Sequence, residues 1–497
     1  MKLNTAIDYV NLGQQLIQEK KIDEAINCYQ QAIHLQPDNF WYYNSLAELF
    51  RTQNKIETAI KYYHKVIELN SKFDNAYLKL GDLYQEKQQW EQATKYYLQA
   101  IKINPQNFWS FFNLGEIAAK QKKFDSAISY YQSGLKIQPH HYLSYCKLGV
   151  IYRQQTQYQK AIESYQKAIT IAPHDNTAYF ALQYIPVDST TLNSLIQFYE
   201  KLAKEYPNIS LLWGNLGDLF TKQDNKEQAL ICYRKSCYYN TISHYSHLKN
   251  LEWPESKQKG PDFIIIGAAK SGTSSLFMYL GEHPQIITPH KKELDFFNQN
   301  YNKGIDWYLS HFPSITDFPE FVTGEASPAY FGDPSAMKRI SKHFPHTKLI
   351  ALLRNPVDRA ISWHYQNVKC GYEKRSLEEV IQEEIIKFNH LQQKGKIQGW
   401  GHIIDGIYIE KLKQWFSFIS QEKFLILKAE DLLNDTNTTM QKTFQFLELP
   451  HHNSEKYLKY NTGSYVLDDS DLKQKLKTIF RPYNEQLEEY MNLKLNW

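Results

Sequence analysis

The chain has 497 residues, 42% of them hydrophobic, and a formal net charge of +4. This length is sufficient for two to four domains, and the nearly balanced charge gives no indication of a nucleic-acid partner. No apolar run approaches the roughly 20 residues that a membrane-spanning helix requires. Residues 1–15 also contain no apolar stretch typical of a secretory signal. We therefore expect no membrane span and a cytoplasmic protein.

The cysteines support the same expectation. They form an odd, scattered set with no metal-ligand spacing, at Cys28, Cys146, Cys232, Cys237 and Cys370. Cys232 and Cys237 are close enough in sequence to suggest a disulfide, but core positions of a helix are the preferred alternative. A reducing compartment fits this pattern best, and no metal site is predicted.

From about residue 6 to residue 243 the sequence repeats every 34 residues. The pattern is an aromatic residue, then Leu and Gly or Ala three and four residues later, then Ala, Tyr, Ala and Pro. The frame begins at Tyr9, Tyr43, Tyr77, Phe111, Tyr145, Tyr179 and Trp213. The sixth copy is degenerate and contains Pro186, which would break an ordinary helix, so we expect a local distortion there instead of a domain boundary.

This period and pattern resemble the tetratricopeptide (TPR) repeat. The resemblance implies paired antiparallel helices stacked into an all-α solenoid over residues 6–243. It also implies a concave face that binds a protein or peptide ligand. Several tyrosines are then interpreted as packing residues of the repeat. Residues 244–260 lose the period and gain charge, which indicates a linker.

From residue 261 to residue 497 the pattern changes to short apolar runs separated by helical stretches. Strands are predicted at 263–267, 321–327, 348–354 and 423–428. Helices are predicted between them, at 357–369, 376–394 and 405–420. This alternation favours an α/β domain with a parallel sheet covered on both faces, in which ligands bind at the carboxyl ends of the strands.

The first of these strands leads into a short, small-residue loop and then into the start of a helix. This geometry directs backbone N–H groups at an anion. Nucleotide-triphosphate loops place a lysine after the second glycine, whereas here Lys270 comes before it. The residues predicted to hold a phosphate group are Lys270, Ser271, Gly272, Thr273, Ser274 and Ser275. A lysine in this early position indicates contact with the first phosphate of a donor.

Four further motifs resemble the sulfotransferases that modify heparan-type glycans, especially their N-sulfotransferase branch. These motifs are KELDFFNQNYNKGIDWY (292–308), GEASPAYF (324–331), LLRNPVDRAISWHY (352–365) and RPYNEQLEEYMNLKLNW (481–497). The resemblance implies a P-loop-like sulfotransferase domain. Its donor would be 3′-phosphoadenosine 5′-phosphosulfate (PAPS), used without a metal ion. The acceptor would be a hydroxyl or amine of a glycan, a glycolipid or a protein side chain.

The resemblance also assigns roles to particular residues. Glu293 matches the catalytic base, Lys270 neutralises the leaving phosphate, and Arg354 and Ser362 match the binding site of the donor's 3′-phosphate. A late loop that closes on the donor matches Gly463, Ser464 and Tyr465. Two alternatives remain from the residues themselves: Arg354 could pair with Asp358, and Lys291 and Lys292 could form a solvated turn or attract an acidic acceptor.

Two departures from the family pattern favour a soluble, bacterial-type enzyme. Ala326 replaces a lysine that many glycan-modifying relatives carry, and the paired cysteines of Golgi relatives are missing. Two other functions remain possible. One is a TPR scaffold with an inactive nucleotide-binding domain. The other is a kinase dependent on a nucleoside triphosphate, which the early lysine and the lack of a strand-end aspartate disfavour.

Overall fold

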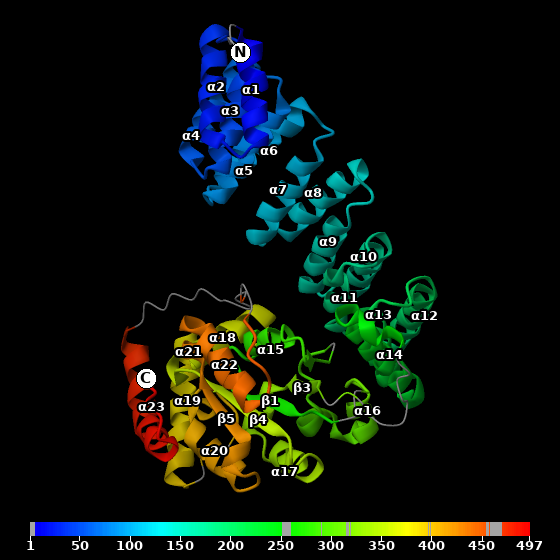
Figure 1. Ribbon diagram of the computed structural model, residues 1–497, viewed down its shortest axis with the longest axis vertical. Helices are drawn as coiled ribbons and strands as arrows, with labels where there is room; N and C mark the ends of the chain where they lie inside the picture. Colours follow the sequence, from blue (N-terminus) through cyan, green and yellow to red (C-terminus); the bar gives the residue numbers. More distant parts are fainter. Residues whose placement is uncertain are drawn as a thin grey trace. The chain divides into compact units, whose positions relative to one another are not determined.

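The computed structural model describes residues 5–250, 260–289, 291–314, 318, 320–395, 397, 399–453, 457 and 470–497. The chain divides into two compact units, Met1–Thr191 and Leu192–Trp497. The first unit is entirely helical, and the second combines helices with a parallel sheet (Figure 1).

The first unit consists of helices that pack in antiparallel pairs. In chain order they are α1 (Ala6–Gln18), α2 (Ile22–Leu35), α3 (Phe40–Thr52), α4 (Ile56–Leu69), α5 (Asp74–Glu86), α6 (Trp90–Ile103), α7 (Phe108–Lys120), α8 (Phe124–Ile137), α9 (Tyr142–Gln154), α10 (Tyr158–Ile171) and α11 (Asn176–Gln183). The predicted 34-residue period therefore corresponds to one helix pair per repeat.

Close packing within each pair explains the glycine of the pattern. A Cβ atom added to Gly115 would lie 2.7 Å from the ring of Tyr131, and one added to Gly149 would lie 2.5 Å from the ring of Tyr165. Both rings are completely buried. The small residue of the first helix thus leaves room for the tyrosine of the second, which confirms the packing interpretation of these tyrosines.

A carboxylate next to that glycine is bonded in the same way in successive repeats. The Tyr97 hydroxyl donates to Asp82 Oδ1 at 2.9 Å, and the Tyr131 hydroxyl donates to Glu116 Oε1. Each carboxylate also receives a hydrogen bond from the first helix of the next repeat. Asn113 Nδ2 donates to Asp82 at 2.9 Å, and Lys147 Nζ donates to Glu116 at 2.8 Å.

The sixth repeat is distorted where the sequence predicts. Its first helix, α11, ends at Gln183, and its second helix, α12 (Ser189–Glu205), begins after Pro186. The division between the two compact units falls between Thr191 and Leu192, inside α12. The expected local distortion is therefore present, while the expectation that it marks no domain boundary stays a prediction.

The second unit begins with the rest of α12 and the seventh repeat, α13 (Ser210–Lys222) and α14 (Lys226–His244), followed by the short helix η1 (Ser246–Asn250). The predicted linker starts within this described part, while residues 251–259 lie outside it. The domain limits 6–243, 244–260 and 261–497 stay a prediction.

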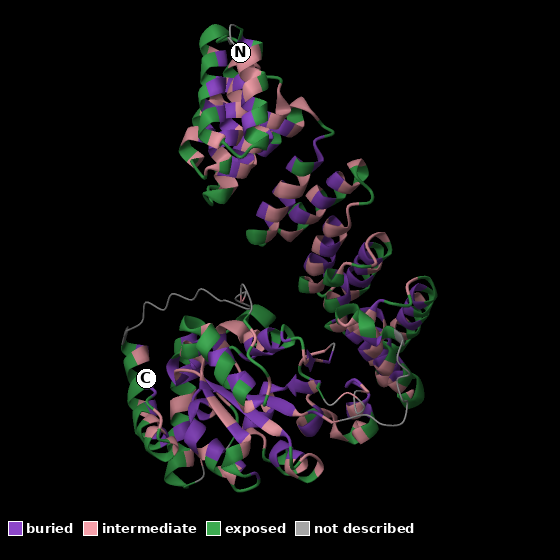
Figure 2. Ribbon diagram, in the orientation of Figure 1, coloured by how far each residue is buried: buried purple, intermediate pink, exposed green. Residues whose placement is uncertain are grey.

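A five-stranded parallel sheet forms the centre of the second unit, in the order β2-β3-β1-β4-β5. The strands are β1 (Phe263–Gly267), β2 (Ile286–Ile287), β3 (Val322–Ala326), β4 (Lys348–Leu353) and β5 (Phe424–Lys428). The four predicted strands are confirmed within one or two residues, and the two-residue β2 was not predicted. β1, β3 and β4 are almost entirely buried, whereas most residues of β5 are half-buried (Figure 2).

The elements around the sheet are α15 (Thr273–Gly281), η2 (Phe296–Asn300), η3 (Tyr301–Lys303), α16 (Ile305–Leu309), η4 (Pro328–Gly332), α17 (Pro334–His343), α18 (Pro356–Cys370), α19 (Leu377–Gln393), η5 (Ile404–Gly406), α20 (Tyr408–Phe416), η6 (Gln421–Lys423), α21 (Ala429–Asn434), α22 (Thr436–Phe446) and α23 (Ser470–Met491). One face of the sheet packs on α15, α21 and α22 in a single apolar cluster. The predicted helices correspond to α18, α19 and α20.

Two further expectations can be compared with the structure. All five cysteines are free, so Cys232 and Cys237 form no disulfide and are buried core residues of α14. Of the helices formed by the described residues, none combines the length and the apolar character that a bilayer crossing needs.

Candidate functional site

The predicted anion loop connects β1 to α15. All five residues of β1 are buried, so the strand fixes the start of the loop firmly within the sheet. Gly272 precedes α15 with φ of 92°, a left-handed conformation that glycine adopts without strain. The first turn of the helix therefore presents its free N–H groups beside Lys270 and Ser271, as the loop motif predicts.

Burial and a neighbouring positive charge both disfavour the charged form of Lys270. Burial lowers the pKa of the Lys270 ammonium, and the nearby Arg354 guanidinium lowers this pKa further. Ser271 and Thr273 are buried, whereas Ser274 and Ser275 are half-buried. The Ser271 hydroxyl lies beside the phenol of Tyr408 but makes no hydrogen bond of ordinary geometry among the described residues. A bound phosphate would neutralise the two cations.

Arg354 follows β4, the strand next to β1, and its side chain reaches the loop. Arg354 Nη1 donates to the carbonyl of Lys270 at 3.1 Å, and the Tyr408 hydroxyl donates to the carbonyl of Arg354 at 2.8 Å. Ser362 is buried on α18, the helix that begins directly after this strand. Among the described residues Arg354 forms no ion pair with Asp358. The structure therefore brings Lys270 and Arg354 together.

Glu293 lies in the segment before η2, beside the carboxyl end of β3, the other strand that neighbours β1. Its backbone N–H donates to the carbonyl of Ala326 at 3.0 Å, and its φ is 64°. Its side chain is 53% exposed and forms an ion pair with Lys292. The Glu293 carboxylate is also near enough to Lys270 to oppose the lowering of that pKa. The predicted base and the predicted phosphate-binding lysine thus belong to one site.

A buried carboxylate that sequence reasoning did not assign, Glu325, lies under this site. It accepts hydrogen bonds from the hydroxyls of Tyr308 at 2.8 Å, Ser327 at 2.7 Å and Tyr330 at 3.2 Å. Burial raises its pKa to about 7, while these hydroxyls oppose the increase. Glu325 belongs to the GEASPAYF motif, but nothing in one sequence indicates that this glutamate is completely buried.

The hydroxyls bound to Glu325 in turn hold the backbone that follows Glu293. Asp295 N–H donates to Ser327 Oγ at 3.1 Å, and Phe296 N–H donates to the Tyr330 hydroxyl at 2.8 Å. Burial, and next the neighbouring Glu293 charge, raise the pKa of Asp295 to about 6. Glu293 therefore precedes a segment that a buried polar network holds in place.

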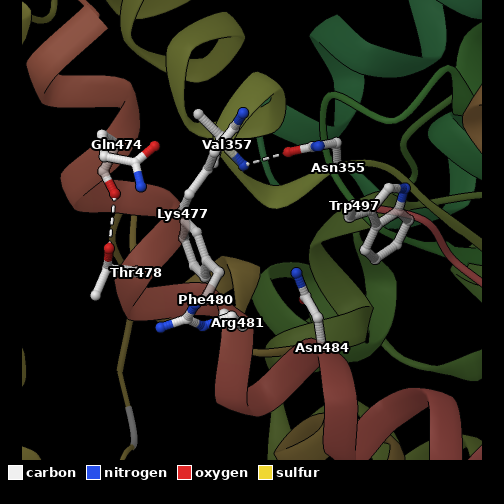
Figure 3. Close-up of a pocket in the computed structure, with 9 residues that line it drawn as sticks. All are labelled: Asn355, Val357, Gln474, Lys477, Thr478, Phe480, Arg481, Asn484 and Trp497. Atoms are coloured by element: carbon white, nitrogen blue, oxygen red, sulfur yellow. Dashed lines mark hydrogen bonds between the residues drawn. The ribbon is translucent and has the colours of Figure 1, made fainter.

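Gly463, Ser464 and Tyr465 lie outside the described residues, so their assignment stays a prediction. A cavity of about 220 Å³ opens where the start of α18 meets α23 and the C-terminal Trp497 (Figure 3). It borders Asn355, the neighbour of Arg354, but none of its lining residues is a predicted site residue.

The comparisons with known proteins agree with both halves of this architecture. A family model described as "Sulfotransferase domain" matches residues 260–475. Models described as "TPR repeat" and "Tetratricopeptide repeat" match residues 13–122, 107–174 and 211–241. The chain carries tetratricopeptide repeats and a sulfotransferase domain. Both resemblances read from the sequence are thereby confirmed.

Individual relatives cover mainly the C-terminal part. The bifunctional heparan sulfate N-deacetylase/N-sulfotransferase 1 of Caenorhabditis elegans is 31% identical over 212 residues, which are 41% of this chain and 24% of that protein. Heparan sulfate glucosamine 3-O-sulfotransferase 5 of Homo sapiens is 28% identical over 264 residues, 48% of this chain and 75% of that protein. A solved sulfotransferase from Alicyclobacillus acidocaldarius is 27% identical, with a TM-score of 0.40, covering 48% of this chain and 98% of its own.

The chain thus spans only about a quarter of the length of the N-deacetylase/N-sulfotransferase relatives. Within the residues that the structure describes, no group of three or more His, Cys, Asp or Glu side chains is arranged to hold a metal ion. The positive charge described at the site comes from Lys270 and Arg354.

Proposed function

We propose that this protein transfers a sulfuryl group from PAPS to a hydroxyl or amine of an acceptor, with the TPR repeats recruiting the acceptor or a partner protein. The observation that carries the proposal is the meeting of Lys270, Arg354 and Glu293 at the ends of three adjacent parallel strands. Cations to hold two phosphate groups thereby lie beside a carboxylate that can accept a proton.

In the proposed reaction the acceptor oxygen or nitrogen attacks the sulfur in line with the bond to the 5′-phosphate. The sulfur–oxygen bond breaks, and its electron pair stays on that phosphate. Lys270, with the N–H groups at the start of α15, stabilises the charge that develops there. Glu293 removes the proton from the attacking group. Arg354 and Ser362 hold the 3′-phosphate, and the carbonyl contact from Arg354 to Lys270 couples the two phosphate sites.

The names of the relatives suggest the acceptor to test first. Both act on heparan sulfate according to those names, one as an N-sulfotransferase and one as a glucosamine 3-O-sulfotransferase. We therefore propose a glycan that contains an amino sugar as the leading acceptor class, with glycolipids and protein side chains as alternatives in the same assay.

A titration with 3′-phosphoadenosine 5′-phosphate (PAP), the by-product of sulfuryl transfer, tests the donor assignment without knowledge of the acceptor. Binding should occur in the low micromolar range or tighter and should survive the removal of divalent metals by EDTA. A protein that does not bind PAP, or that binds it as well after Lys270→Ala, contradicts the proposal. Transfer of ³⁵S from PAPS to N-deacetylated heparan sulfate then tests the acceptor class.

A further inference from the structure

The seventh repeat carries the same carboxylate as the regular repeats before it. Asp218 on α13 is in the repeat position of Asp82 and Glu116. As in those repeats, a tyrosine of the second helix donates to it: the Tyr233 hydroxyl bonds to Asp218 Oδ1 at 2.8 Å. The local structure of the seventh repeat is therefore regular, although this repeat belongs to the same compact unit as the sheet.

The second hydrogen-bond donor to Asp218 comes from a different part of the chain than in the earlier repeats. In the third and fourth repeats the next repeat supplies it, through Asn113 and Lys147. For Asp218 the sulfotransferase domain supplies it instead, since Lys291 Nζ donates to Asp218 Oδ2 at 2.6 Å. Lys291 lies 73 residues further along the chain, so this partner takes the place of a side chain from an eighth repeat.

Other contacts extend this replacement over the end of the solenoid. Trp307 Nε1 donates to Thr221 Oγ1 at 3.1 Å, and the ring centroids of His311 and Tyr233 are 4.0 Å apart. Asn240 Nδ2 donates to the carbonyl of Thr288 at 3.3 Å. We call the residues from Thr288 to His311 that the structure describes the capping segment. The capping segment covers the last repeat, as a terminal capping repeat does in other solenoids.

The capping segment also carries Glu293, two residues after Lys291. On the sheet side this part of the chain is held by Ala326 and by the hydroxyls that bind Glu325. On the solenoid side it is held by the contact between Lys291 and Asp218. We infer that Asp218 of the seventh repeat is a positioning residue for the base Glu293. This inference rests on the proposed function, because Glu293 is the base only if the domain transfers sulfuryl groups.

The charges near Asp218 explain why its loss should move the segment. The ammonium groups of Lys222 and Lys303 lie close enough to feel both Asp218 and Lys291, and burial lowers the pKa of each. One carboxylate therefore stabilises three mutually repelling cations. Without its charge, Lys291 would be repelled by the other two and would leave its position, taking the turn before Glu293 with it.

The experiment compares two isosteric variants of the full chain, Asp218→Asn and Glu116→Gln. Glu116 is a matched control, because it also binds one tyrosine and one lysine but lies in the first unit. The probe reaction is the slow transfer of ³⁵S from PAPS to water, in which water is the acceptor and no other acceptor has to be identified. We expect Asp218→Asn to lower turnover at saturating PAPS about 10-fold, with the affinity for PAP changed less than 2-fold, and Glu116→Gln to leave both unchanged.

Two further measurements separate positioning from ordinary loss of stability. Asp218→Glu keeps the negative charge and should retain most of the wild-type turnover. In a chain that already carries Lys291→Met, Asp218→Asn should lower turnover no further. Hydrogen exchange at the amides of Glu293, Asp295 and Phe296 should be faster in Asp218→Asn than in Glu116→Gln, whether or not the protein turns over PAPS. Unchanged exchange at these amides overturns the inference. A wild-type protein that does not bind PAP overturns the proposed function instead.

Discussion

The loop that we propose binds the donor (residues 267–273, the donor loop) and the segment that carries the proposed base (residues 291–297, the base-bearing segment) lie at the carboxyl ends of neighbouring strands but are built differently. The donor loop connects a strand directly to a helix, so residues that are adjacent in sequence define its motif, and contacts with Leu352 and Arg354 add to its support. The base-bearing segment has little regular structure, and its shape depends on contacts with Ala326, Ser327, Tyr330 and Asp218. Substitutions in the first should therefore alter donor binding, and substitutions around the second should alter turnover alone.

The largest effect is expected for Glu293→Gln. A glutamine keeps the size of the side chain but cannot accept the proton, so turnover should fall by about 10³-fold while PAP affinity stays the same. The assay is ³⁵S transfer from PAPS, with PAP titration in parallel. Glu282→Gln, at the exposed end of α15, is the control. A turnover within 10-fold of the wild type would remove Glu293 from the catalytic role.

Lys270→Ala should have the next largest effect, on the donor side of the comparison. Loss of the ammonium should weaken PAP binding about 100-fold, because in the proposed site Lys270 and Arg354 together balance the charge of the donor's phosphates. Isothermal titration measures this change, with the exposed Lys442→Ala as control. Equal affinities in the two variants would show that the loop does not hold the donor.

Glu325→Gln should change the pH dependence of stability. Since burial raises the Glu325 pKa from its ordinary value of 4.5 to about 7, the folded state binds this proton more tightly than the unfolded state. The contribution of Glu325 to the free energy of unfolding therefore falls as the pH rises from about 4.5 to about 7. A glutamine does not titrate, so between pH 5 and pH 8 the variant should gain up to about 3 kcal/mol relative to the wild type.

Urea unfolding at both pH values measures this difference. If the free energy of unfolding depends on pH in the same way for both proteins, the pKa of Glu325 is not raised by folding. The stability of its hydrogen-bond network then does not depend on its protonation. Turnover by the variant should fall by less than that of Glu293→Gln, because Glu325 is linked to the segment after Glu293 through the hydroxyls of Ser327 and Tyr330 and does not itself contact the acceptor in the proposed reaction.

The smallest expected effect concerns the cysteines. Burial raises the pKa of the Cys146, Cys232 and Cys237 thiols to about 12 and also raises that of Cys28, whereas Cys370 is exposed at the end of α18. A thiol-specific disulfide reagent should therefore modify about one thiol per native chain and all five after unfolding. Because Cys370 lies near Lys270, saturating PAP should slow the native reaction a few-fold. No protection by PAP would place the donor away from this end of α18.

The contrast between the two regions also explains what could be predicted from the sequence. The repeats and the donor loop were accessible, because a fixed period or a run of adjacent residues specifies them. The buried network of Glu325 could not be predicted, because Tyr308 and Tyr330 precede and follow β3 in the sequence. A single sequence also does not distinguish a buried glutamate from an exposed one. The contact between Asp218 and Lys291 joins a repeat to a different fold, and no periodicity indicates it. The strand β2 is too short to produce a pattern.

The place of the seventh repeat sets a limit on how the protein can be divided and recombined. Removal of everything before the sheet would expose the rings of Trp307 and His311, which are buried in this structure. A chimaera that receives a foreign array of repeats should keep α13 and α14 with the enzyme and place the junction near residue 191. The helix pair α13 and α14 thus behaves as a structural part of the sheet-containing unit, although its sequence is that of a repeat.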